Sequence, residues 1–271
     1  MPSKTVIMVE ILIATAIVFI VFVAYLNLGL SPLPTTSPTP SPSSTPNPTI
    51  YPSPRISADL NWGGYAVATN FSNPQPVVTG VSGYWTVPQI DVSSTDTFSA
   101  IWVGIGGTFT NSLIQVGTEQ DCTNGQVSYY AWYELLPLNS RTLMDMIVSP
   151  GDRIAASVTM EDPLLDSWSV DIHNLANNQS FHQSFIYYAD QLSAEWIVER
   201  PTVNGQLSSL ADFSQLTFLN CTAIVNGSTE KTGNLNFVQT LLQNRAGNPL
   251  VEISNITSDG SSFSVKYLVT S

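Results

Sequence analysis

The sequence predicts an all-β protein: a two-sheet antiparallel β-sandwich, preceded by one N-terminal transmembrane helix and a stalk rich in Pro, Ser and Thr. Residues 11–30 are uncharged and predominantly apolar, and residues 31–54 hold nine of the 18 prolines. From 57 to 271, short runs of alternating apolar residues are broken by Gly, Asn, Asp and Pro, which is typical of strands and turns. Only 235–244 resembles a helix there, and weakly.

The apolar segment 11–30 is long enough to cross a bilayer, because twenty residues in a helix span about 30 Å. A cleavable signal peptide has a shorter apolar core of about 7–15 residues. We therefore expect an uncleaved signal anchor, with secretion after signal cleavage as the alternative. Lys4 places residues 1–10 in the cytoplasm and the rest of the chain outside the cell.

Residues 31–56 form the predicted linker, since a stretch of Pro, Ser and Thr cannot pack a core. It is expected to be an extended spacer that can carry O-linked glycans. Beyond it, residues 57–271 form the extracellular domain. Asn-X-Ser/Thr sequons, which accept glycans only outside the cytoplasm, predict a glycoprotein. They begin at Asn70, Asn178, Asn220, Asn226 and Asn255.

The domain divides into runs that each alternate apolar and polar residues, as strands with one buried face do. Such runs pair into two antiparallel sheets packed face to face. The expected strands are 78–87, 99–106, 128–135, 153–160, 167–175, 194–199 and 262–271.

Charge composition excludes some classes of partner. The chain has 8 Lys and Arg against 20 Asp and Glu, a formal net charge of −12. Nucleic-acid binding needs clustered Lys and Arg, and the sequence has no basic run. In acid the carboxylates become neutral, so a chain with few bases avoids the charge repulsion that unfolds proteins. An ordinary acidic extracellular surface has the same composition.

The two cysteines leave two alternatives open. Cys122 and Cys221 can form one long-range disulfide, as exported proteins often do. They can equally remain two separate buried thiols.

Several hydrolytic mechanisms lack their residues. A Ser or Cys triad needs a histidine base. The only histidines, His173 and His182, lie in an expected hairpin where both face solvent. No HExxH motif or zinc-ligand spacing occurs, and no Asp-Thr-Gly or Asp-Ser-Gly motif of aspartic peptidases. We therefore expect neither a metal nor an organic cofactor.

Carboxylate chemistry remains. A glycosidase needs two carboxyl groups about 5–9.5 Å apart. Glu195 and Glu199 share a face of the strand 194–199 but would lie roughly 13 Å apart. Glu134 and Glu199, from different strands, stay open as a glycosidase pair.

Five short strings, followed by Leu210–Ser214, occur in one order across residues 60–220. Together they resemble the eqolisin family of glutamic peptidases. The resemblance implies a lectin-like jelly roll of the concanavalin type, in agreement with the strand pattern. The five strings are Asn61–Gly64, Trp102–Ile105, Leu113–Gly117, Ala131–Glu134 and Ala194–Glu199.

The resemblance implies that Gln115 and Glu199 are the catalytic pair. As a carboxylate, Glu199 can take a proton from water and return it to the leaving amine. The Gln115 amide can hold the attacking water and then donate to the tetrahedral oxyanion. An amide does not titrate, so this arrangement suits an acidic optimum.

Five further residues match supporting positions of the family. Glu134 would line the cleft and tune the pKa of Glu199 by like-charge repulsion. Trp62 and Trp132 would shape substrate binding, although strand aromatics also pack cores. Glu119 stands where the family usually has Asp. Together with two other departures, Gly106–Gly107 and Arg200–Pro201, it suggests a prokaryotic-type member. Glu195 is expected to support the site without being a catalyst.

Together these observations predict a surface-anchored, acid-acting endopeptidase that hydrolyses extracellular polypeptides. It would be a monomer, would bind the membrane through its N-terminal helix and would not bind nucleic acid. Two alternatives remain: a non-catalytic, lectin-like glycan-binding module, and a glycosidase using Glu134 and Glu199.

Overall fold

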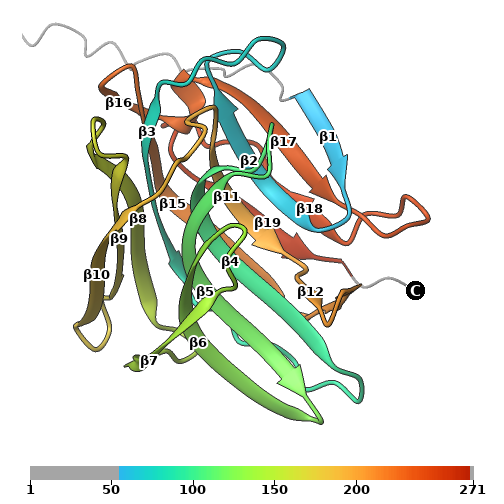
Figure 1. The fold of residues 1–271 in the computed structure, drawn as a ribbon. Helices are drawn as coiled ribbons and strands as arrows, with labels where there is room; N and C mark the ends of the chain where they lie inside the picture. The colour runs from blue at the N-terminus through green and yellow to red at the C-terminus, as the bar shows by residue number, and fades with distance from the viewer. Residues whose placement is uncertain (1–54, 269–271) are drawn as a thin grey trace, which may run out of the picture. The chain divides into compact units, whose positions relative to one another are not determined.

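The structure, a computed structural model, describes residues 55–268, and two β-sheets pack face to face in this part of the chain (Figure 1). The predicted all-β sandwich is thereby confirmed. The predicted membrane helix at 11–30 and most of the linker lie outside the described residues. Within 55–268, no helix is long and apolar enough to cross a membrane.

The first sheet has nine strands and carries the residues expected to be functional. Neighbouring strands are antiparallel except where β1 meets β17 and where β14 meets β4. The order is β1 (Arg55–Asp59), β17 (Asn236–Leu242), β2 (Trp62–Ala68), β11 (Ala194–Glu199), β4 (Thr97–Gly106), β5 (Leu113–Thr123), β6 (Gln126–Leu135) and β7 (Arg141–Ile147), with β14 (Ser209–Leu210) beside β4.

The second sheet has eight antiparallel strands. Their order is β10 (Gln179–Ile186), β9 (Ser167–Asn174), β8 (Arg153–Asp162), β3 (Val78–Thr86), β15 (Gln215–Val225), β19 (Phe263–Tyr267) and β18 (Val251–Ile253), with β16 (Ser228–Lys231) beside β15. A separate short hairpin joins β12 (Thr202–Val203) to β13 (Gln206–Leu207), and Thr232–Asn234 forms a 3-10 turn, η1.

All seven expected strands are present, with ends that differ by a few residues. The weak helix expected at 235–244 is wrong, because this segment is strand β17. Side chains alternate between the two faces along β17, as in a strand, and Phe237 and Gln239 point into the sandwich. The Gln239 amide donates a hydrogen bond to the Tyr65 hydroxyl at 2.9 Å. Tertiary packing overrides a local helical tendency here.

The main hydrophobic core lies between the two sheets. Its largest members are fully buried aromatic side chains, which together with Val and Ile fill the space between the inner faces. They include Tyr65, Trp85, Trp168, Trp196, Phe218 and Phe263.

The other face of the nine-stranded sheet is not simply polar. It carries a second, smaller buried apolar cluster, formed by Ala100, Trp102, Leu113, Trp132 and Ile197. We call this surface the site face.

The disulfide considered for the two cysteines does not form in the structure. Cys122 lies on β5 of one sheet and Cys221 on β15 of the other, and both are free and buried. The Cys122 sulfur accepts a hydrogen bond from the Ser93 N–H at 3.3 Å. Both thiols therefore pack as small apolar side chains within the core.

The histidines lie as expected in the β9–β10 hairpin. His173 is exposed, and His182 is 60% exposed with its Nδ1 2.7 Å from an Asp171 oxygen. The hydrogen bond that the imidazole donates to this carboxylate raises the pKa of His182.

Candidate active site

One row of side chains crosses the site face at the level of Glu199. On β11, Glu199 pairs with Trp62 of β2 on one side and with Ala100 of β4 on the other. Ala100 pairs in turn with Glu119 of β5, and Glu119 with Tyr130 of β6. Paired residues point to the same face of a sheet, so the small Ala100 leaves space between two carboxyl groups.

A second row crosses the same face at the level of Gln115. Gln115 of β5 pairs with Gly104 of β4 and with Glu134 of β6. Gly104 also pairs with Glu195 of β11. The two expected catalytic residues therefore lie on one sheet and one face, separated by the strand β4.

Both rows open into one cavity of about 510 Å³. It contains six of the seven expected catalytic and supporting residues, and no Lys, Arg or His is among its described lining residues. The lining consists of Trp62, Ala100, Leu113, Gln115, Glu119, Tyr130, Trp132, Glu134, Leu136, Ser140, Glu199, Pro201, Thr202, Val203 and Asn204.

Glu199 is held by indole rings. The Trp102 Nε1–H donates to Glu199 Oε2 at 2.8 Å, and the Trp62 ring packs edge-on against Trp102 at 5.0 Å. The pKa of Glu199 is raised to about 7, chiefly by burial and also by the Glu134 charge, whereas hydrogen bonds from Trp102 and Trp62 oppose the rise. Trp102 thus engages one of the two carboxyl oxygens, Oε2.

Gln115 is held by its neighbour on β6. The Gln115 Nε2 donates to Glu134 Oε2 at 2.8 Å, and the side chain is almost completely buried. Burial raises the pKa of Glu134, while the hydrogen bond from Gln115 lowers it. One N–H of the amide is thus engaged, and the second remains to bind a ligand.

Glu119 lies in the cavity with no hydrogen-bond partner among the described residues. Burial raises its pKa to about 8, and the charges of Asp121, Glu199 and Glu134 add to the rise. Behind it, burial raises the pKa of Asp121 to about 6, although the Tyr130 hydroxyl donates to that carboxylate at 2.9 Å. The cavity therefore holds carboxyl groups that keep their protons more tightly than in water.

Glu195 is the expected supporting residue that does not line the cavity. Its side chain is fully buried, and Oε1 accepts a hydrogen bond from Thr108 Oγ1 at 2.6 Å. Burial raises its pKa well above the ordinary value. Glu195 thus ties β11 to the loop between β4 and β5.

Two glycines make this packing feasible. A Cβ on Gly117 would lie 2.2 Å from the Ile101 carbonyl oxygen, so only glycine lets β4 and β5 approach beneath Trp102. Gly107 has a φ of +92°, and a Cβ there would lie 2.6 Å from the Trp62 ring. The position of Trp62 also depends on Asp59, whose Oδ1 accepts the Trp62 backbone N–H at 3.0 Å.

Sequence reasoning missed two parts of the site. Trp102 stood within a recognised string but was not identified as the partner of Glu199, since no sequence signal pairs β4 with β11. The β12–β13 hairpin, whose residues Thr202–Asn204 line the cavity, has a detectable signal. Its turn residues Asn204 and Gly205 both have positive φ, as the Asn-Gly type I′ hairpin predicts.

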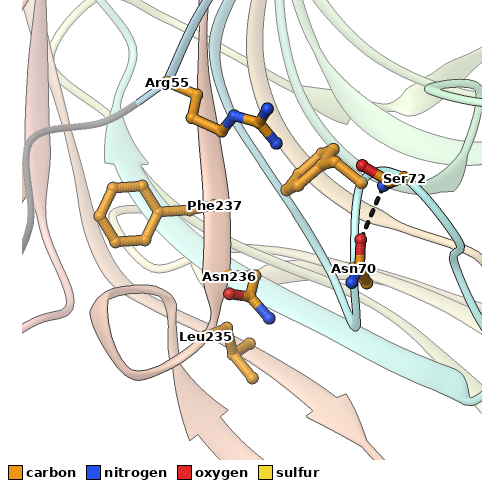
Figure 2. Close-up of a pocket in the computed structure, with 7 residues that line it drawn as sticks. Arg55, Asn70, Ser72, Leu235, Asn236 and Phe237 are labelled. Carbon is orange, nitrogen blue, oxygen red and sulfur yellow. Dashed lines mark hydrogen bonds between the residues drawn. The ribbon is translucent and has the colours of Figure 1, made fainter.

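A second cavity of about 420 Å³ lies beside β1, β17 and the loop after β2 (Figure 2). Figure 2 shows Arg55, Asn70 and Asn236 around it with Phe237. Its described lining residues include no carboxyl group and none of the expected site residues. Among residues 55–268, no group of three His, Cys, Asp or Glu side chains is placed to hold a metal ion.

Comparison with known proteins decides the family. Residues 60–267 match the model of the Peptidase A4 family. The chain belongs to the Peptidase A4 family. This finding confirms the eqolisin resemblance, which rested on strings within residues 60–220.

Named relatives and solved structures agree with this membership of the Peptidase A4 family. The chain is 35% identical to aspergillopepsin-2 of Aspergillus niger over 155 residues, which span 55% of this chain and 53% of that protein. It is 25% identical to scytalidopepsin B of Scytalidium lignicola over 225 residues, or 78% and 79% of the two chains.

The fold of this Peptidase A4 member matches a solved scytalido-glutamic peptidase, crystallised with a peptide-based transition-state analogue, with a TM-score of 0.64. That match has 25% identity and covers 78% of this chain and 99% of the other. Aspergilloglutamic peptidase from A. niger matches with a TM-score of 0.55 and 30% identity, covering 64% and 99%.

Proposed function

We propose that this chain is a glutamic endopeptidase that hydrolyses extracellular polypeptides in acid, with Glu199 and Gln115 as its catalytic pair. One observation carries the proposal: in a member of the Peptidase A4 family, both side chains line the same cavity of the same sheet. A binding module has no need of a partly buried carboxyl group and a buried amide in one cavity.

Glu199 would act first as a general base. The carboxylate takes a proton from a water molecule, and the resulting hydroxide attacks the carbonyl carbon of the peptide bond. Trp102 fixes Oε2, so the proton would go to Oε1. The same proton is then delivered to the leaving nitrogen as the C–N bond breaks, which regenerates the carboxylate.

Gln115 would stabilise the oxyanion. Its free N–H would donate to the carbonyl oxygen as negative charge develops there, while Glu134 holds the other N–H. Because the amide is neutral at every pH, its donor capacity is the same in acid and at neutrality. The other cavity walls, Trp62, Trp132 and Leu136, would contact substrate side chains.

The pKa values set the expected working range. The base form of Glu199 requires loss of a proton whose pKa is raised to about 7, so activity should fall as pH drops below that value. The buried carboxyl groups destabilise the fold when they ionise, and Glu119 ionises with a pKa of about 8, so activity should also fall as pH rises beyond about 7. We therefore expect an optimum in mild acid, at or just below pH 7.

The proposed location is the cell surface. Its support is the apolar segment 11–30, the Pro-rich linker, and the exposure of all five sequon asparagines in the domain. The full-length chain should fractionate with membranes, and a variant lacking residues 11–30 should be soluble. Recovery of the full-length chain in the soluble fraction would reject the anchor.

The activity test uses the detergent-solubilised full chain with a denatured protein substrate between pH 3 and pH 7. Glu199→Gln and Gln115→Ala should each lose at least 100-fold in kcat, on the order of the cost of removing an oxyanion donor. Glu252→Gln, an exposed carboxyl on the other sheet, is the matched control. Undiminished proteolysis by Glu199→Gln, or release of sugar from glycans instead of peptides, would overturn the proposal.

A further inference from the structure

Two polar atoms beside the cavity have no hydrogen-bond partner among residues 55–268. The Gln115 Oε1 is buried and accepts nothing, and the Trp132 Nε1–H is buried and donates to nothing. Their side chains are 3% and 4% exposed, so solvent does not satisfy either atom. A buried polar group left unpaired destabilises the fold, so each requires an explanation.

The register places the two residues as diagonal neighbours. Gln115 pairs with Glu134, and Trp132 lies two residues before Glu134 on the same face of β6. Trp132 itself pairs with Gly117, which has no side chain to separate it from Gln115. One atom is a donor and the other an acceptor, so a single water molecule can satisfy both.

We propose that Trp132 is a positioning residue: its indole N–H holds the Gln115 carbonyl oxygen through one internal water molecule. The inference rests on the proposed role of Gln115 as oxyanion donor. Together, Glu134 and Trp132 would fix which end of the amide faces which neighbour. Glu134 accepts a hydrogen bond from the amide Nε2, and Trp132 would hold the carbonyl oxygen through the water molecule.

The orientation has a chemical consequence. An amide turned by 180° would place its carbonyl oxygen against the Glu134 carboxyl and lose the bond from Nε2. The observed orientation satisfies Glu134 with one N–H of the amide and leaves the second N–H for the oxyanion. Trp132 would thus act on catalysis through Gln115, in addition to the contact its ring makes with substrate.

The test compares two Trp→Phe variants in the full-length protein. Trp132→Phe removes the N–H and keeps an aromatic ring, so kcat should fall at least tenfold while KM stays within about twofold. Trp168→Phe is the control, because Trp168 Nε1 is likewise buried and unpaired but lies in the second sheet. An unchanged kcat in Trp132→Phe, or a loss confined to KM, would overturn the proposal.

A second readout does not depend on activity. The side-chain NH₂ signals of Gln115 in a ¹⁵N-labelled sample, identified by their loss in Gln115→Glu, should shift in Trp132→Phe and stay fixed in Trp168→Phe. If the signals do not move in either variant, the link between Trp132 and Gln115 is rejected. Absence of proteolysis in the wild type would count against the proposed function alone.

Discussion

At the scale of single residues, the carboxyl groups of the site differ in what donates to them. Glu199 receives the Trp102 indole N–H, Glu134 receives the Gln115 amide, and Glu119 receives nothing among the described residues. A hydrogen bond to the charged form lowers a carboxyl pKa, whereas burial raises it. Each donor is therefore a means of setting the pH range of activity.

Removing the Trp102 donor should move that range. In Trp102→Phe the carboxylate form of Glu199 loses its hydrogen bond, so its pKa rises and the acidic limb of kcat/KM shifts to higher pH. At pH 5 we expect a loss of about tenfold, as for a hydrogen bond to a charged group. Trp85→Phe, which loses a buried bond to Thr118 in the core, should leave the profile in place. An unshifted limb in Trp102→Phe would contradict this role.

Neutralising Glu134 should have the opposite effect. Glu134→Gln removes a charge that raises the pKa of Glu199 but keeps an oxygen to accept the Gln115 N–H. The acidic limb of kcat/KM should therefore shift to lower pH. The pH profile measures this directly, and a shift to higher pH would show that Glu134 acts in some other way.

Part of this geometry was predictable from the sequence. Asn124 and Gly125 form a two-residue turn with positive φ, so Thr123 pairs with Gln126 and counting back pairs Gln115 with Glu134. The contact between Trp102 and Glu199 was not predictable, because the register of β4 and β11 depends on tertiary packing between distant segments. Local turn chemistry fixes one contact and long-range assembly the other.

At the scale of elements, alternation located strands because each strand has one face in the core. It failed at β17, where a short mixture of polar and apolar residues fits the period of a helix as well as that of a strand. It also failed at β1, which is almost wholly exposed and was assigned partly to the linker. The β12–β13 hairpin is too short for any periodicity to show. Yet it follows Glu199 directly in the chain and forms one wall of the cavity.

The hairpin can be tested by straining its turn. Gly205 has a φ of +75° and open space around its Cβ position, so Gly205→Ala adds backbone strain without a clash. The cost of about 1 kcal/mol should loosen this wall and raise KM more than it lowers kcat. Gly227→Ala is the matched control, with the same φ in the Asn226-Gly227 turn of the β15–β16 hairpin. Equal effects of the two variants on KM would rule out a role in substrate binding.

At the scale of the whole molecule, the buried carboxyl groups link stability to pH. Burial raises the pKa of Glu119 to about 8, of Glu199 to about 7 and of Asp121 to about 6, and it also raises those of Glu134 and Glu195. Between the unfolded and folded values, the folded state binds more protons than the unfolded state. Stability therefore falls as pH rises through this interval.

We expect the free energy of unfolding to be highest near or below pH 4.5, the ordinary value for these glutamates, and to fall steadily up to pH 8. The chain has few bases, so acid brings little charge repulsion to offset the gain. Denaturant unfolding of the full-length chain from pH 3.5 to pH 8, followed by circular dichroism, measures the dependence. A maximum at neutral pH would contradict it.

Two variants test which carboxyl groups cause this pH dependence. Folding raises the pKa of one of the replaced carboxyl groups, Glu119, and lowers that of the other, Asp259. Glu119→Gln removes the ionisation with the highest of the values given above, so it should stabilise the protein at pH 8 by about 1–3 kcal/mol and leave pH 4 nearly unchanged. Asp259 has a pKa lowered to about 2 by hydrogen bonds from Ser261 and Thr257. Asp259→Asn should therefore lose stability at pH 5 and at pH 8 alike. If Glu119→Gln follows the same pattern, the carboxyl of Glu119 is ionised and stabilising, and the acid preference of this fold has another source.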